Sequence, residues 1–370
     1  MMAGDWSRVP GAVLDDAGLL RHLGEPMKEQ RALAAGRAVA PLGDRAVLAV
    51  PGEDRLSWLD SLSSQALKGL APGVSTELLV LDPQGHVEHQ AAVLDDGETT
   101  WLIADREDAE GLLAWLVRMR FRLRVAPRDA SAELSVVGLA PAALGLVVPA
   151  EPAGVPLVWR DPWPGVEIGG VGYAADEGHP GGDRSWCEAL VAPAEVERLV
   201  VAAVAGETAV AGLDAVEALR VAAWRPRWAA EADGRTLPHE VDWMRTAVHL
   251  DKGCYRGQET VAKVHNLGHP PRRLVALHLD GSDSLLPARG DAVLVDGAPV
   301  GAITSSARHY EDGPIALAIV KRQLAAGAEL VVETVDGPIA AAAAVIVPPE
   351  AGSAASVPRL PRLSRRTASR

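Results

Sequence analysis

The chain has 370 residues and a formal net charge of −13 at pH 7, and 48% of its residues are hydrophobic and 23% charged. This length predicts two or three domains, and the acidic balance argues against a surface built for nucleic-acid backbone, although one local basic groove is not excluded. The two cysteines, Cys187 and Cys254, cannot form a disulfide framework or supply the four ligands of a structural zinc site or an iron–sulfur cluster.

We expect neither a signal peptide nor a membrane-spanning segment. The N-terminus lacks a charged start followed by an apolar core, so we expect no signal peptide. The longest apolar run, Ile339 to Val347, is mostly alanine and too short to span a bilayer. We therefore expect a cytoplasmic protein with no membrane partner, and nucleic acid is not an expected partner either.

The first part of the chain predicts an N-terminal arm, residues 1–42, with some helix around 16–40, followed by a first α+β unit, residues 43–140. The expected elements of that unit are strands at 47–50, 77–81, 87–94, 99–104, 123–126 and 134–139, and helices at 52–67 and 106–121. Turn chemistry such as Pro83-Gln84-Gly85 separates the strands. This order predicts a sheet with helices on one face.

A second α+β unit is expected over residues 141–270. Its first part, 141–183, is rich in proline and glycine, and we predict an irregular loop there. A phosphate cradle is less favoured because the strand–GxGxxG–helix order is missing. A strand at 186–191 and helices at 193–204 and 213–223 complete the unit.

The predicted secondary structure changes after residue 270, from mixed helices and strands to short strands. Short strands recur at 274–279, 292–295, 300–304, 315–320, 330–333 and 340–347, and Asp296-Gly297 is a hairpin turn signal. This pattern predicts a small barrel or sandwich over residues 271–348. Residues 349–370 lack periodicity and are expected to form a disordered tail.

One stretch, Asp251 to Thr260, gathers many chemically capable side chains. Cys254 lies between Lys252 and Arg256, and glycines bracket it. In an exposed turn the two cations would stabilise the thiolate of Cys254, which predicts a reactive thiol or a transient soft-metal ligand. The alternative is a small buried residue in a turn. Cys187, by contrast, is expected in a strand within the core.

Histidines near this stretch form no standard pattern. His239, His265 and His269 match neither H-E-x-x-H nor a zinc spacing, so we predict surface or hydrogen-bonding roles and no metal site. No local spacing supports a Cys–His dyad. The tryptophans that flank the stretch are either walls for a flat heterocycle or large core residues; they are Trp224, Trp228 and Trp243.

Arg220 lies on the apolar face of the helix predicted at 213–223. A buried arginine is costly unless it is paired. It therefore either forms an ion pair, for example with Glu217 or Asp242, or grips a ligand carboxylate through its two-pronged guanidinium.

The stretch Lys252-Gly253-Cys254-Tyr255-x-Gly257-Gln258-Glu259 resembles the signature of the YgfZ-type folate-binding proteins, which are relatives of the aminomethyltransferase (T protein) of the glycine cleavage system. Three weaker matches to this wider superfamily occur in the right order, at residues 52–59, 219–223 and 301–305. The resemblance extends from about residue 43 to about residue 347.

The resemblance implies two ferredoxin-like α+β units and a small C-terminal β-barrel around a central cavity that holds tetrahydrofolate or a derivative. It also implies folate-dependent support of iron–sulfur cluster assembly or repair, with iron–sulfur client or assembly proteins as partners and Cys254 as the functional, catalytic thiol. The implied cofactor-binding positions are Arg220, Lys252, Tyr255, Gly257, Gln258 and Glu259.

One departure from the aminomethyltransferases concerns their paired aspartates, which follow an early glycine turn. Here that turn is Gly85, and the equivalent place falls near His89-Gln90. Glu88 is expected on the opposite strand face. A carboxylate beside the folate nitrogen is therefore missing, which favours a binding or carrier role over an enzyme. The alternative is a folate-dependent aminomethyltransferase or demethylase, and folate-dependent tRNA modification is a third hypothesis.

Overall fold

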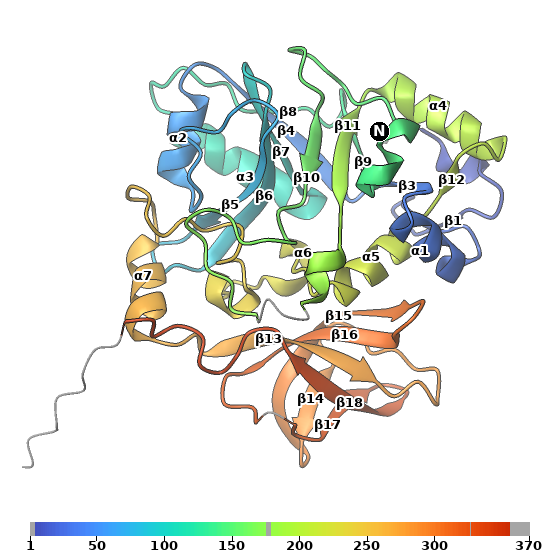
Figure 1. Ribbon diagram of the computed structural model, residues 1–370, viewed down its shortest axis with the longest axis vertical. Coiled ribbons are helices and arrows are strands. Elements are labelled where there is room, and N and C mark those ends of the chain that lie inside the picture. The colour runs from blue at the N-terminus through green and yellow to red at the C-terminus, as the bar shows by residue number, and fades with distance from the viewer. Residues whose placement is uncertain (1–3, 175–178, 326, 356–370) are drawn as a thin grey trace, which may run out of the picture.

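The computed structural model describes residues 4–174, 179–325 and 327–355. Two five-stranded sheets lie beside each other, and a closed six-stranded barrel lies beneath both of them (Figure 1). A short β-ribbon, β1 (Val13–Leu14) with β2 (Leu20–His22), belongs to the N-terminal arm. The predicted combination of α+β units with a C-terminal barrel is confirmed.

The first sheet is antiparallel throughout, with the strand order β5 (Ser75–Leu81), β6 (Val87–Asp95), β7 (Thr99–Asp105), β4 (Arg45–Pro51) and β8 (Arg128–Asp129). Alternate residues of β6 point to opposite faces. Ala91 and Val93 join the core under α2 (Arg55–Leu62) and α3 (Arg106–Met119), whereas Ala92 and Leu94 face the second sheet. The sheet is therefore buried on both faces.

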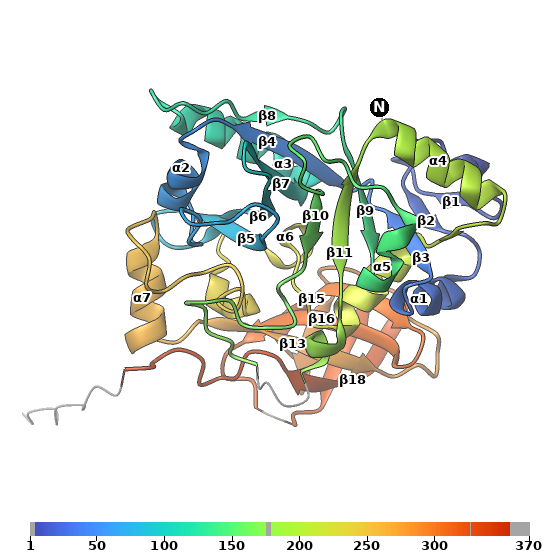
Figure 2. The same cartoon turned by 45° about the horizontal axis from the view of Figure 1, so that its top comes forward.

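The second sheet has the strand order β10 (Val158–Arg160), β11 (Cys187–Val191), β9 (Ser135–Leu139), β3 (Ala38–Pro41) and β12 (Ala209–Val210). Only the pairing of β3 with β12 is parallel. Its helices are α1 (Pro26–Ala34), α4 (Pro193–Val204) and α5 (Leu213–Ala222). Figure 2 shows α4 and α1 beside this sheet, and they pack on its opposite faces: Leu199 of α4 joins the core that contains Val39, and Leu33 of α1 joins the core that contains Ala40. Cys187 is fully buried in β11, as expected.

Three expectations for the N-terminal half were wrong. The strand near 134–139, expected in the first unit, pairs with β3 and β11 of the second sheet. Its Val136 and Val137 enter cores on opposite faces, and the edge of the first sheet is already taken by β8. The predicted arm contributes β3 to the same sheet, and its helix is only α1, which starts at Pro26. The strand predicted at 123–126 is a turn and loop instead.

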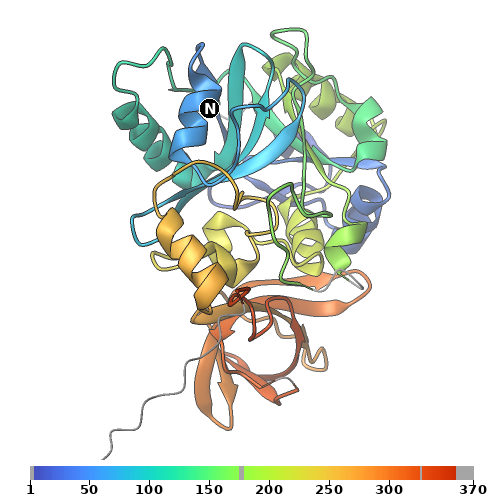
Figure 3. The ribbon, with the colours of Figure 1, turned by 60° about the vertical axis from the view of Figure 1, so that its left-hand side comes forward.

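The barrel closes in the order β13 (Arg272–Leu279), β16 (Gly313–Lys321), β15 (Ala298–His309), β14 (Ala292–Val295), β17 (Leu330–Thr334) and β18 (Gly337–Val345). Asp296 and Gly297 both adopt positive φ, as a two-residue hairpin turn between β14 and β15 requires. Two further helices, α6 (Trp228–Glu231) and α7 (Gln258–Leu267), precede the barrel. Figure 3 shows α7, in amber, next to the barrel and beneath the first unit.

The segment after the barrel does not begin as a free tail. The backbone amides of Ser353, Ala354 and Ala355 donate to the carbonyl oxygens of Val264, His265 and Asn266 in the last turn of α7, where helix carbonyl groups often lack partners. The disorder expected from residue 349 is therefore wrong for residues 349–355, whereas residues 356–370 lie outside the described part of the chain. Within the described part, no helix is long and apolar enough to cross a membrane.

Gly52 has no room for a side chain. Its φ is +125°, and a Cβ there would lie 2.0 Å from the carbonyl oxygen of Arg124. We expect Gly52→Ala to lower the free energy of unfolding by about 3 kcal/mol, measured by urea denaturation. Gly24→Ala is the control, because Gly24 also has positive φ but open space around it, and it should cost about 1 kcal/mol. Equal losses in the two variants would contradict the steric argument.

Candidate functional site

A cavity of about 600 Å³ lies where the first sheet, the second sheet and the barrel meet. It is lined by Arg45 from β4, Glu188 from β11, Arg220 from α5 and Ser305 from β15, among others. A narrow extension of about 30 Å³ continues past Glu188 to Gln90 on β6, which is room for about one water molecule. We call this space, with its extension, the central cavity.

A chain of ion pairs crosses the wall of the central cavity. Arg227 contacts Asp44 and Asp105, each at 2.6 Å. Asp105 also contacts Arg45 at 2.8 Å, and Arg45 reaches Glu188 at 3.5 Å. Burial alone would raise the pKa of Asp105, but Arg45 and Arg227 hold it below its usual value. The cavity wall is thus charged and held in place by its own pairing.

Three buried polar atoms of the residues lining the central cavity have no hydrogen-bond partner in the described part of the chain. They are Asp44 Oδ1, Arg184 Nε and Glu188 Oε2. Unpaired buried polar groups are rare because each costs about 1–3 kcal/mol. Three such atoms on residues that line one cavity show that the hydrogen bonding of its wall is incomplete.

Arg220 lines the central cavity, but all five of its N–H groups already have acceptors. Nε and Nη2 donate to the two carboxylate oxygens of Glu217, and the remaining contacts are with Glu231, Ser305 Oγ and the carbonyl oxygen of Arg225. Burial would lower the pKa of Arg220, but the two glutamates raise it above its usual value. The ion-pair alternative therefore holds, with Glu217 and Glu231 as partners. Asp242 pairs with Arg245 instead.

The place that the resemblance equates with the paired aspartates of the aminomethyltransferases holds His89 and Gln90. Gln90 lines the extension of the central cavity and donates to Glu77 Oε2 at 2.9 Å. His89 points to the opposite side of the sheet, where its Nδ1 lies 2.5 Å from Asp108 Oδ1. Burial raises the pKa of Asp108. Neither residue of the pair thus brings a carboxylate of its own to the cavity.

The signature stretch forms an exposed loop that leads into α7. Cys254 is exposed, so the alternative of a small buried residue does not hold. Lys252 is fastened to the end of α2: its Nζ donates to the carbonyl oxygens of Asp60, Ser63 and Gln65 at 2.5–2.8 Å. Its side chain is only 3% exposed, and burial lowers the pKa of Lys252 to about 8.

The second cation of the signature also has another partner. Arg256 pairs with Glu88 at 2.7 Å, next to the bulge at the start of β6. The structure thus directs both cations, Lys252 and Arg256, to contacts away from the thiol of Cys254. The loop is shaped and anchored by these residues, and its sulfur remains accessible.

The other signature residues support the loop and α7. Gly257 has a φ of +83°, and a Cβ there would lie 2.6 Å from the carbonyl oxygen of Asp82 and 3.0 Å from Gly85 Cα. Gln258 donates to the carbonyl oxygen of Lys252 at 3.4 Å. Tyr255 is buried, and its ring centroid lies 5.4 Å from Lys252 Nζ. Glu259 is exposed.

The predicted binding residues are therefore not all in one place. Arg220 lines the central cavity, but Lys252, Tyr255, Gly257, Gln258 and Glu259 do not. Sequence reasoning missed the cavity residues Asp44, Arg45, Arg184, Glu188 and Arg227. A usable signal was present for one of them, because Glu188 is a charged residue inside an otherwise apolar strand.

The histidines near the signature have hydrogen-bonding roles. His239 is buried, its Nε2 lies 3.2 Å from the carbonyl oxygen of Val261, and its ring stacks on Tyr173. In the described ranges no group of three or more His, Cys, Asp or Glu side chains is placed to hold a metal ion. Of the flanking tryptophans, Trp243 is completely buried, and Trp228 donates to the carbonyl oxygen of Glu88.

The barrel matches the family model described as the glycine cleavage T-protein C-terminal barrel domain, over residues 272–349. An aminomethyltransferase of a Nostoc species is 27% identical over 310 residues, which are 80% of each chain. Over most of its length the chain is thus similar to aminomethyltransferases. A putative chloroplastic transferase of Arabidopsis thaliana is 32% identical over 119 residues, which cover 31% of this chain and 26% of that protein.

The similarity extends to the three-dimensional structure. The glycine cleavage system aminomethyltransferase T from Bartonella henselae superposes with a TM-score of 0.70 at 18% identity, covering 92% of this chain and 94% of that one. The aminomethyltransferase-like fold predicted from the signature is therefore present.

Lys252→Met is expected to destabilise the protein by about 2–3 kcal/mol, because it leaves the carbonyl oxygens at the end of α2 without their shared donor. The measurement is urea unfolding followed by tryptophan fluorescence. Lys263→Met, at an exposed position on α7, is the matched control and should change stability by less than about 0.5 kcal/mol. A neutral Lys252→Met variant would show that this anchor is unimportant.

His239 should make the protein sensitive to acid. Burial lowers the pKa of His239 to about 3, so between pH 6.5 and pH 3 the unfolded chain binds a proton that the folded chain does not. The free energy of unfolding should therefore decrease as the pH falls below 6.5, by up to about 1.4 kcal/mol per pH unit. His239→Gln should flatten this part of the stability curve, whereas His278→Gln, at an exposed site, should leave it unchanged.

Proposed function

We propose that this chain binds tetrahydrofolate or a derivative in the central cavity, and that it serves as an accessory protein for iron–sulfur cluster assembly or repair instead of transferring an aminomethyl group. The observation that carries the folate proposal is the unpaired Glu188 Oε2 of a residue lining a cavity of about 600 Å³, within an aminomethyltransferase-like fold.

The residues present fit a reduced folate. The volume is within the usual range for small-molecule sites. A carboxylate such as Glu188 can accept from the neighbouring N–H groups of an aminopyrimidine ring, and the indole of Trp186 supplies a flat wall. Arg289, exposed on the barrel side, offers a cation for the acidic tail, because its only hydrogen bond in the described structure goes to the carbonyl oxygen of Ala229.

The chain's own residues suit binding better than proton transfer. Tetrahydrofolate would supply the nitrogen atoms that carry one-carbon units. Arg45 contacts Glu188 at 3.5 Å and orients its carboxylate, so Glu188 can fix the direction of a bound ring. Gln90 cannot gain or lose a proton near neutral pH, because its side chain is an amide. Gln90, which faces the extension of the central cavity, thus provides no general acid or base, in agreement with a carrier role.

The accessory role gives Cys254 its part in the proposal. The thiol is exposed on a loop that Lys252 fastens to α2 and Gln258 fastens to itself. A held, accessible thiol suits contact with an iron–sulfur client or assembly protein, which matches the role implied by the signature. Because the signature loop does not line the central cavity, folate binding and thiol chemistry would be separate properties of this chain.

A folate-dependent aminomethyltransferase is the second candidate. The observation in its favour is the 27% identity to the Nostoc aminomethyltransferase over 80% of both chains. Robust turnover of an aminomethyl or N-methyl donor with tetrahydrofolate by the native chain would support it over the accessory role. Loss of iron–sulfur enzyme support in Cys254→Ser cells, with folate affinity retained, would support the accessory role.

Glu188→Gln tests the folate site directly. Isothermal titration with tetrahydrofolate should show affinity at least about 10-fold lower than that of the native protein, since the amide offers only one acceptor oxygen. Glu133→Gln, at an exposed site, and Cys254→Ser should both bind as the native chain does. Thermal melting checks that Glu188→Gln remains folded. Failure of the native protein to bind tetrahydrofolate, or undiminished binding by Glu188→Gln, would contradict the proposal.

A further inference from the structure

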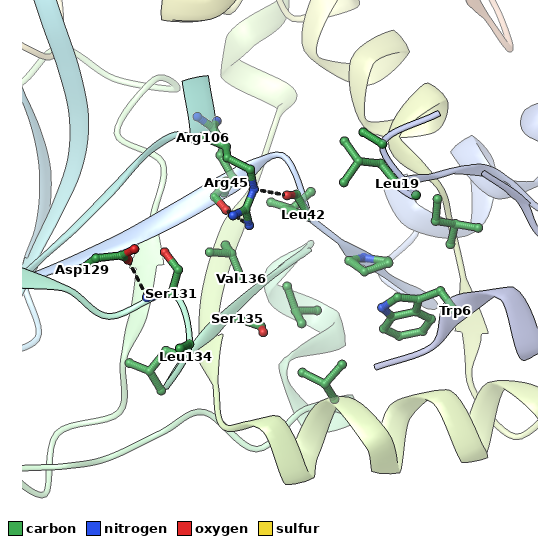
Figure 4. Close-up of a pocket in the computed structure, with 18 residues that line it drawn as sticks. Trp6, Leu19, Leu42, Arg45, Arg106, Asp129, Ser131, Leu134, Ser135 and Val136 are labelled. Carbon is green, nitrogen blue, oxygen red and sulfur yellow. Dashed lines mark hydrogen bonds between the residues drawn. The ribbon is translucent and has the colours of Figure 1, made fainter. Parts of the chain in front are cut away.

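We propose that a second pocket, separate from the folate site, binds a small carboxylic acid with an apolar body. The pocket has a volume of about 350 Å³ and lies between the N-terminal arm, β3, β9 and the start of α4. Figure 4 shows Trp6 and Leu19 of the arm on one side of it and Asp129 and Ser131 on the other. We call it the arm pocket.

The apolar half of the arm pocket comes from distant parts of the chain. Trp6 and Leu19 are half-buried: Leu19 packs against the core that contains Leu42 and Val136, and Trp6 packs against the core that contains Val196. These walls suit an aromatic ring or a short aliphatic chain. A ligand body buried against them would gain about 25 cal/mol for each Å² of apolar surface removed from water.

A pre-positioned cation borders the arm pocket. Arg106 donates from Nε to the carbonyl oxygen of Gly43 at 2.7 Å and from Nη2 to that of Arg45 at 2.9 Å. No carboxylate pairs with Arg106 in the described structure, and its Nη1 makes no hydrogen bond there. Two carbonyl contacts fix the planar guanidinium without neutralising it, which is the arrangement that receives a carboxylate at low entropic cost.

The remaining polar groups of the pocket add another donor and one competing charge. The hydroxyl of Ser135 has no hydrogen-bond partner in the described residues, so it can donate to a ligand oxygen. Arg45 is already occupied by Asp105 and Glu188. Asp129 is an exposed carboxylate that accepts from the amide of Ser131 at 2.8 Å. A cationic ligand would bind to Asp129 instead of Arg106. Comparing an anionic with a cationic ligand therefore tests the proposal directly.

The arm pocket adjoins the central cavity without being part of it. Both are lined by Ala17, Leu19, Leu42 and Arg45, whereas Trp6, Arg106 and Ser135 line only the arm pocket. This inference goes beyond the proposed function and does not depend on it, because the arm pocket can be tested in the absence of folate.

The test uses three probes with the same body and different ends: 4-phenylbutyrate, 4-phenylbutanol and 4-phenylbutylamine. Isothermal titration of the full chain without folate should show binding of the acid at least about 10-fold tighter than that of the alcohol or the amine. Arg106→Met should remove this preference, and Arg106→Lys should retain part of it. Arg118→Met, an exposed arginine on α3 that does not line the pocket, is the control and should bind all three probes as the native chain does.

A second variant addresses the apolar wall. Trp6→Ala should weaken the acid and the alcohol by a similar factor of about 10, because it removes contact area common to both. Thermal melting verifies that each variant is folded. Absence of binding by all three probes, tighter binding of the amine, or an Arg106→Met variant that still prefers the acid would overturn the proposal.

Discussion

Buried and half-buried arginines join the three parts of this molecule. Arg227 and Arg45 share Asp105, which ties the segment before α6 to the first sheet, and Arg45 continues to Glu188 of the second sheet. Arg220 connects α5 to Ser305 of the barrel. Breaking one partner of such a buried pair costs several kcal/mol, because it leaves a charge without compensation. The cavity at this junction therefore has charged walls whose positions are set by the contacts between domains.

The same network explains why the arginine expected to grip a ligand does not have donors to spare. A guanidinium has five N–H groups, and in Arg220 each already has an acceptor. The unpaired groups sit instead on neighbours that the network holds: Glu188 keeps an oxygen free, and Arg184 keeps Nε free. The motif match pointed to α5, which does line the cavity. Only the hydrogen bonds show that Arg220 supports the structure and has no donor left for a ligand.

The local sequence pattern located individual strands well, but it did not predict which distant strands pair with each other. Alternation and turn residues located β5, β6, β7 and the barrel strands, because hairpin neighbours are close in sequence. The pairing of β9 with β3 joins residues about a hundred positions apart, and no local signal encodes it. Likewise Cys254 stood out through its neighbours in sequence, whereas Asp44, Arg184 and Glu188 meet only after folding.

The close approach of Gly85 and Gly257 has a consequence for how this sequence can change over time. A Cβ at either position would enter the space of the other turn: 2.9 Å from Thr260 Cβ for Gly85, and 3.0 Å from Gly85 Cα for Gly257. The two glycines are more than 170 residues apart, yet the backbone of one leaves no clearance for a side chain on the other. Homologues that lose one of them should have lengthened or rebuilt the opposite turn, so the two loops should covary as a unit across the lineage.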